Sequence, residues 1–88
     1  MARGSDRPHY GKFRGRVVDD LDPLGLGRAI VEVPSVGLSG WALPCVPFGD
    51  MGDEGRFSAP PPGTNVWVEF EGGDPDRPVW VGVFPDGV

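Results

Sequence analysis

The amino-acid sequence predicts one all-β domain, a small barrel built from five short strands. Fifteen glycines and eleven prolines, which break helices, fall between short runs of valine, tryptophan and phenylalanine, which suit a pleated strand. Some of these runs alternate apolar and polar residues, as half-buried strands do. No window carries the i, i+3, i+4, i+7 apolar spacing of a helix. A length of 88 residues is enough for one core only.

The first two strands are predicted at 10–18 and 28–33. In the first, YGKFRGRVV, Phe13, Gly15 and Val17 fall on one face and the basic residues on the other. In the second, RAIVEV, the alanine and both valines share one face. The proline that follows cannot donate to the ladder and ends the strand.

The middle of the chain gives weaker signals. Residues 19–27 are dense in Asp, Pro and Gly and are predicted to form a loop. A turn at 35–40 leads into a third strand at 41–46. The Gly- and Pro-rich stretch 47–62 holds only a weak strand candidate at 56–59.

The strongest signal is a C-terminal β-hairpin. Residues 64–71, TNVWVEFE, alternate, so that two valines and Phe70 point inward. The sequence GGDP at 72–75 is a turn signal, and 78–84, PVWVGVF, forms the return strand. Two such runs joined by a Gly/Asp/Pro loop predict a hairpin whose loop is longer than two residues.

Five short strands with turns about every 8–12 residues suit a small closed barrel, and the strand number and length match a barrel of the OB type. We therefore predict a single OB-fold domain at 10–88. The polar segment 1–9 is predicted to be a flexible N-terminal arm.

Charge and composition argue against several classes of protein. The formal net charge of this chain is −5. A protein that neutralises nucleic-acid phosphates or binds an anionic membrane needs basic residues instead. The single cysteine, Cys45, cannot form an internal disulfide and is expected to be buried as a small hydrophobe. The polar N-terminus lacks an apolar signal region, and no run approaches the length of a membrane span. We expect a protein made in the cytoplasm without a signal peptide.

A basic stripe on the first strand, formed by Lys12, Arg14 and Arg16, raises an alternative function. OB barrels bind single-stranded nucleic acid through such grooves when aromatic rings lie beside them. Rings that could stack bases are Tyr10, Trp67 and Trp80. The competing interpretation is a solvated strand face whose charges pair with carboxylates such as Glu69 and Glu71, and the acidic balance of the chain favours it.

Catalytic and metal-binding patterns are not found in the sequence. The one histidine, His9, lies in the predicted arm, where it cannot be held against a nucleophile. The acidic run at 19–22 lacks the spacing and glycine of a calcium loop. Gly25 and Gly27 precede neither the Lys-Ser/Thr pair nor the helix of a phosphate-binding loop. The sequence predicts no enzyme, no cofactor, no metal and no small-molecule substrate.

Three tryptophans need an explanation in so short a chain. Trp41 begins a strand and is expected in the core. Trp67 and Trp80 are out of phase with the valines of their strands, which predicts that both point outward. They either stabilise the hairpin across its strands or anchor a subunit interface, and both interpretations stay open.

The spacing of these residues resembles the N-terminal OB domain of baseplate hub and central spike proteins of contractile phage tails. Related domains occur in type VI secretion spikes of the valine-glycine-repeat family and in extracellular contractile injection particles. The family signature matches these positions: Pro60, Gly63, Val66, Val68, Phe70, Gly73, Asp74, Pro78 and Gly82.

Several of the signature residues have an expected structural role. Phe70 ends the inward row of its strand, and Gly73-Asp74 makes the reversal that sets the hairpin register. Pro78 begins the return strand where no donor is needed, and Gly82 lets a neighbouring backbone or ring come close.

The resemblance implies a structural, non-catalytic homotrimer in a baseplate, which joins the tail hub to a spike or tip protein. It implies assembly into the virion of a phage or into a phage-tail-like particle. In the family a β-helix needle usually follows the barrel, whereas this sequence ends at Val88. If the chain is complete, it is expected to resemble an adaptor or shortened hub.

Overall fold

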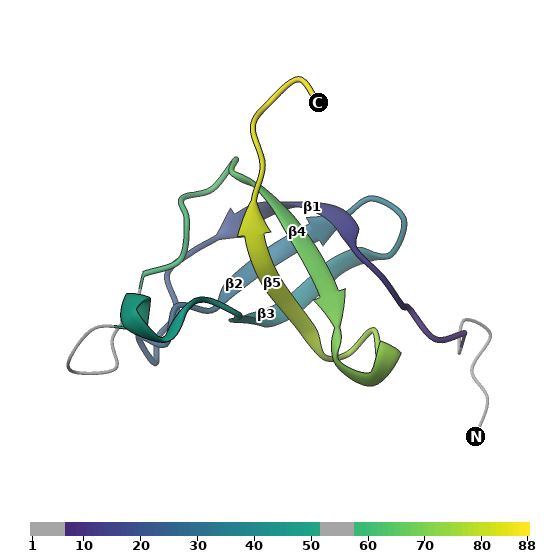
Figure 1. The fold of residues 1–88 in the computed structure, drawn as a ribbon, viewed down its shortest axis with the longest axis horizontal. Helices are drawn as coiled ribbons and strands as arrows, with labels where there is room; N and C mark the ends of the chain where they lie inside the picture. The colour runs from purple at the N-terminus through teal and green to yellow at the C-terminus, as the bar shows by residue number, and fades with distance from the viewer. Residues whose placement is uncertain (1–6, 52–57) are drawn as a thin grey trace.

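The computed structural model describes residues 7–51 and 58–88. Within these ranges, the strands are β1 (Phe13–Asp19), β2 (Ala29–Val33), β3 (Gly37–Pro44), β4 (Asn65–Phe70) and β5 (Pro78–Val83), as Figure 1 shows. Two short 3-10 turns, η1 (Phe48–Met51) and η2 (Glu71–Gly73), are the helical elements of the described part. The all-β prediction is confirmed.

The strands close into a barrel in the order β1-β2-β3-β5-β4, and β4 pairs with β1. Every pairing is antiparallel except that of β3 with β5, which is parallel and short, with Leu43 opposite Val79 and Pro44 opposite Trp80. This five-stranded Greek-key closure is the OB arrangement. The predicted OB-type barrel is therefore confirmed.

The third strand begins earlier than the sequence predicts. Val36 donates its backbone N–H to the carbonyl of Val33 at 2.8 Å, and Gly37 then pairs with Val33, so the turn is confined to the residues between them. The predicted turn at 35–40 is wrong beyond Val36. Of the weak strand candidate at 56–59, the first two residues lie outside the described ranges, and Ser58 and Ala59 are not in a strand.

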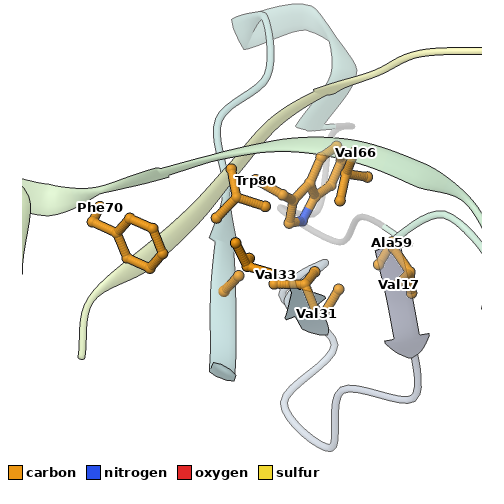
Figure 2. Packing of buried hydrophobic residues seen from close by; sticks show 10 residues of the cluster. Val17, Val31, Val33, Ala59, Val66, Phe70 and Trp80 are labelled. Carbon is orange, nitrogen blue, oxygen red and sulfur yellow. The ribbon is translucent and has the colours of Figure 1, made fainter. Parts of the chain in front are cut away.

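The core is built from small side chains and two large rings. Its members are Val17, Ala29, Val31, Val33, Ala42, Ala59, Val66, Val68, Phe70 and Trp80. Figure 2 shows the Trp80 indole among the labelled valines, with Phe70 to one side of them. Gly15 faces the same interior, where a Cβ would lie 2.9 Å from Val68 Cγ2. A side chain at this position would clash with the packed core.

The phase predicted for β5 is wrong. Phe70 pairs with Pro78 and Val68 pairs with Trp80, so the Trp80 ring points inward and is only 4% exposed. The register then shifts, because Trp67 pairs with Gly82 and Val81 has no opposite residue. Both sets of alternate residues in PVWVGVF are apolar, so periodicity alone could not choose between them; pairing with β4 decides.

Two other burial predictions are also wrong. Trp41 is half-buried on the outside of β3, and the adjacent Ala42 takes the core position, paired with Ala29. Cys45 is exposed: its backbone N–H still donates to the Trp80 carbonyl at 2.9 Å, but the side chain that packs against the core here is that of Val46.

Candidate functional site

The β4–β5 hairpin brings most of the signature residues together. Gly63 has a φ of +92°, and its N–H donates to the Val17 carbonyl at 2.8 Å, which ties the entry of β4 to β1. Phe70 is buried, as predicted. Pro78 begins β5 opposite Phe70, also as predicted.

Asp74 organises the loop between the two strands. Its Oδ1 accepts the Asp76 N–H at 2.9 Å, and its own N–H donates to the Glu71 carbonyl at 3.0 Å. The Glu71 N–H in turn donates to the Arg77 carbonyl at 2.9 Å. This closed set of bonds makes the predicted reversal.

Gly73 has a second task that the sequence did not reveal. Its φ is +79°, and a Cβ there would lie 2.7 Å from Tyr10 Cε1 and 3.1 Å from Pro8 Cβ. The Gly73 carbonyl accepts the His9 N–H at 2.8 Å. The glycine therefore permits the turn and also seats residues 8–10 against it.

The predicted role of Gly82 is wrong. No heavy atom of the described chain lies within 4 Å of a Cβ built there, so neither a backbone nor a ring approaches closely. Gly82 instead sits opposite Trp67 at the register shift of β5.

The His9 side chain packs on the end of the core. Its ring centroid lies 5.8 Å from Phe13 and 5.5 Å from Phe70, and those two rings meet edge-to-face at 5.3 Å. The His9 Nδ1 donates to the Arg7 carbonyl at 2.9 Å. The predicted flexibility of 1–9 stays a prediction, but within it His9 contacts the barrel.

Trp67 is the predicted interface residue that does lie on the outer face. Its ring packs on Phe84 with centroids 4.5 Å apart, and the Arg14 guanidinium lies 5.4 Å from the Trp67 centroid and 5.0 Å from that of Phe84. Arg14 also donates to the Val88 carbonyl. Trp80 lies inside the barrel, so the two predicted anchors do not form one surface.

Two of the three side chains of the basic stripe have partners on the barrel itself. Lys12 Nζ lies 3.1 Å from Glu69 Oε2, one of the predicted carboxylate partners. Arg14 is engaged by the outer rings and the C-terminal segment. Arg16 is exposed on the outer face of β1. Tyr10 lies against Gly73 and keeps 72% of its surface exposed, whereas the buried Trp80 offers no stacking face.

The β1–β2 loop is organised around one carboxylate, which its composition did not indicate. Asp22 accepts the backbone N–H groups of Leu24 (2.9 Å), Leu26 (3.0 Å) and Arg28 (3.2 Å). The Arg28 side chain donates to it from Nε at 3.0 Å and Nη2 at 2.7 Å. Trp80 Nε1 donates to the Gly27 carbonyl at 3.0 Å and so ties the loop to the core.

Hydrogen bonding and burial shift the pKa values of both members of this ion pair. The Asp22 side chain is 3% exposed. Its hydrogen bond from the Arg28 guanidinium, with help from the backbone N–H groups, holds the pKa of the Asp22 carboxyl well below its ordinary value, although desolvation opposes the shift. The same hydrogen bond raises the pKa of Arg28.

The loop presents leucines to solvent beside a shallow groove. Leu21 is 80% exposed, Leu24 64% and Leu26 42%. The Arg28 guanidinium lies 5.5 Å from the centroid of the half-buried Trp41. From there an open groove of about 320 Å³ continues, lined by Arg28, Trp41, Leu43, Glu71, Arg77 and Pro78, among others. In the sequence, this surface is indicated only by three leucines in a loop that otherwise consists of aspartate, proline and glycine.

Within residues 7–51 and 58–88, no group of three or more His, Cys, Asp or Glu side chains is placed to hold a metal ion. In the same part of the chain, no helix is long and apolar enough to cross a membrane.

Comparison with known families gives a match over nearly the whole barrel. The family described as the type VI secretion system/phage-baseplate injector OB domain matches residues 13–84, from the first residue of β1 to just beyond β5. A search of curated proteins finds no match.

Proposed function

The chain belongs to the family of type VI secretion system and phage-baseplate injector OB domains, and from this membership we propose that it joins the tail hub to the spike without catalysing a reaction. The family establishes an OB domain with a structural baseplate role. The observation that carries the proposal is the family match at 13–84, which includes all five strands. The particle is a contractile phage tail or a related injection particle.

The proposed assembly is a homotrimer on the tail axis, with Trp67 in or beside the subunit interface. Trp67 and Phe84 form a half-buried aromatic pair on the outer face. Apolar side chains that remain partly exposed on a surface mark interfaces, and homo-oligomers close with cyclic symmetry.

The non-catalytic part of the proposal rests on what the reactive side chains already do. The His9 ring is packed against Phe13 and Phe70, with Nδ1 bonded to a backbone carbonyl. The most strongly perturbed carboxyl, Asp22, is bound by its own loop and by Arg28. Both groups support the fold.

A reconstruction of the assembled particle tests the proposal. We expect three copies around the axis, in contact with the hub on one side and the spike on the other. Light scattering on the free protein is expected to show a monomer–trimer mixture that shifts with concentration, and Trp67→Ala is expected to shift it toward monomer. Leu38→Ser, which removes an exposed leucine from β3, is the control. A strict monomer that binds no hub or spike protein contradicts the proposal.

A further inference from the structure

The β1–β2 loop is a preorganised display of apolar side chains. The Asp22 carboxylate accepts three backbone and two side-chain N–H bonds, and Trp80 fixes the loop from the core side. A loop held in this way loses little conformational entropy when a partner binds it. Leu21, Leu24 and Leu26 are therefore presented to solvent on a rigid frame.

Folding alone does not explain why this ordered loop keeps its leucines exposed to solvent. Burying a leucine side chain is favourable, yet Leu21 and Leu24 remain more than half exposed. Single exposed apolar residues are ordinary, whereas several on one short loop mark a contact surface.

This loop lies on the side of the barrel where OB folds bind their ligands. That binding face is formed by strands 2 and 3, flanked by the β1–β2 and β4–β5 loops. Here Arg28 links the leucine loop to Trp41, and the groove runs on past Leu43 to Glu71 and Pro78. We call the leucine loop and this groove together the β2–β3 face.

The charges on the β2–β3 face identify the partner's chemistry. Arg28 is neutralised by Asp22, and Arg77 Nε lies 3.7 Å from Asp74 Oδ2. Asp20 in the loop and Glu71 in the groove add further carboxylates. The face thus has an apolar centre and an acidic rim, which complements an apolar surface flanked by lysine or arginine.

The same charges disfavour two other occupants. Nucleic acid needs a basic groove to meet its phosphates. A second copy of the chain that docked through the same face would set its own acidic rim against this one. A different protein is the occupant that the observations favour.

We propose that the β2–β3 face docks a neighbouring baseplate protein, which covers Leu21, Leu24 and Leu26 with an apolar surface and meets the acidic rim with basic side chains. This inference rests on the proposed baseplate function and names the surface through which one partner is held.

Photocrosslinking in the assembled particle tests the inference. A benzoylphenylalanine probe replaces Leu24 in one variant and Leu38 in the control. Leu38 is 70% exposed and pairs with Glu32 near the β2–β3 turn, at the opposite end of β3 from the leucine loop and the groove, neither of which includes it. We expect the probe at Leu24 to crosslink to a different protein chain and the probe at Leu38 to crosslink far less. A crosslink from Leu24 to nucleic acid or to a second copy, or no crosslink, overturns the inference.

A substitution pair gives an independent measurement. Leu24→Ser with Leu26→Ser is expected to lower incorporation into particles about tenfold or more, because two apolar contacts are lost. Leu38→Ser is expected to leave incorporation unchanged. Thermal melts of the free proteins check that both variants fold. Equal incorporation of all three proteins overturns the inference, whereas absence of the wild-type protein from the particle defeats the proposed baseplate function itself.

Discussion

At the scale of single residues, Phe70 and Trp80 fill a barrel whose remaining core side chains are valine and alanine. Protein interiors pack to high density, so a core of short side chains depends on its few large ones to leave no void. Phe70 also supports the outer contacts of Phe13 and His9. Removing the Phe70 ring therefore affects both the core and the packing of His9 and Phe13 against the barrel.

Phe70→Ala is expected to cost about 3–5 kcal/mol, the usual effect of truncating a buried aromatic ring. The total stability of a small domain is of similar size, so the variant should be largely unfolded. Glu71→Ala, next in sequence but exposed, should change stability by about 0.5 kcal/mol or less. Urea denaturation measures both, and equal effects would mean that Phe70 does not fill the core.

At the scale of elements, the β1–β2 loop has order that its composition does not suggest. Asp, Pro and Gly are typical of variable surface turns. Here one aspartate gathers the loop around itself, and Arg28 completes the set from the start of the next strand. The loop is thus expected to exchange its amide hydrogens slowly at Leu24, Leu26 and Arg28.

The pH dependence of stability tests the role of Asp22. Its pKa is lower in the folded than in the unfolded chain, so its contribution is present above the ordinary carboxyl pKa, near 3.8, and declines as the pH falls further. Below that value the unfolded chain binds a proton at Asp22 that the folded chain does not. Asp22→Asn removes this difference.

We therefore expect the wild-type protein to be more stable than Asp22→Asn at pH 7, and this advantage to shrink as the pH is lowered from about 4 to 2. Urea midpoints at several pH values measure it. Asp86→Asn, at an exposed carboxylate that accepts a bond from Asn65, is the control. An advantage that stays constant down to pH 2 would contradict the assigned role of the Asp22–Arg28 pair.

At the scale of the whole molecule, the barrel combines a closed strand arrangement with an acidic surface. Closure pairs the strand edges, which limits uncontrolled edge-to-edge association. The contacts proposed with other chains then use side chains, namely the Trp67–Phe84 pair and the leucines of the β1–β2 loop. The net charge of −5 opposes phosphate binding.

We expect no binding of single-stranded DNA or RNA tighter than the roughly 10⁻⁴ to 10⁻⁶ M of non-specific contacts at physiological salt. Fluorescence anisotropy with a labelled oligothymidylate measures it. Sub-micromolar binding that weakens when Arg14 and Arg16 are neutralised would support the nucleic-acid alternative instead.

By itself, the sequence determined the fold class, the five strands, the inward rows of β1, β2 and β4, and the family. These follow from local periodicity and turn chemistry, which depend only on residues close together in the sequence. The resemblance to the family singled out Gly63, Phe70, Gly73, Asp74 and Pro78, and all five lie in or beside the β4–β5 hairpin.

Only the tertiary structure decided the phase of β5, because both faces of that strand are apolar and pairing with β4 selects which one turns inward. It likewise moved Trp41 out of the core and Trp80 into it. It also showed that Asp22 and Arg28 form a pair, and that the leucines beside them stand out from the barrel. The phase of β5 and the positions of the two tryptophans depend on pairing between strands, which closure of the barrel creates and local pattern cannot express. The Asp22–Arg28 pair lies within one loop, and it depends on the backbone turns that bring the loop's own N–H groups to the carboxylate.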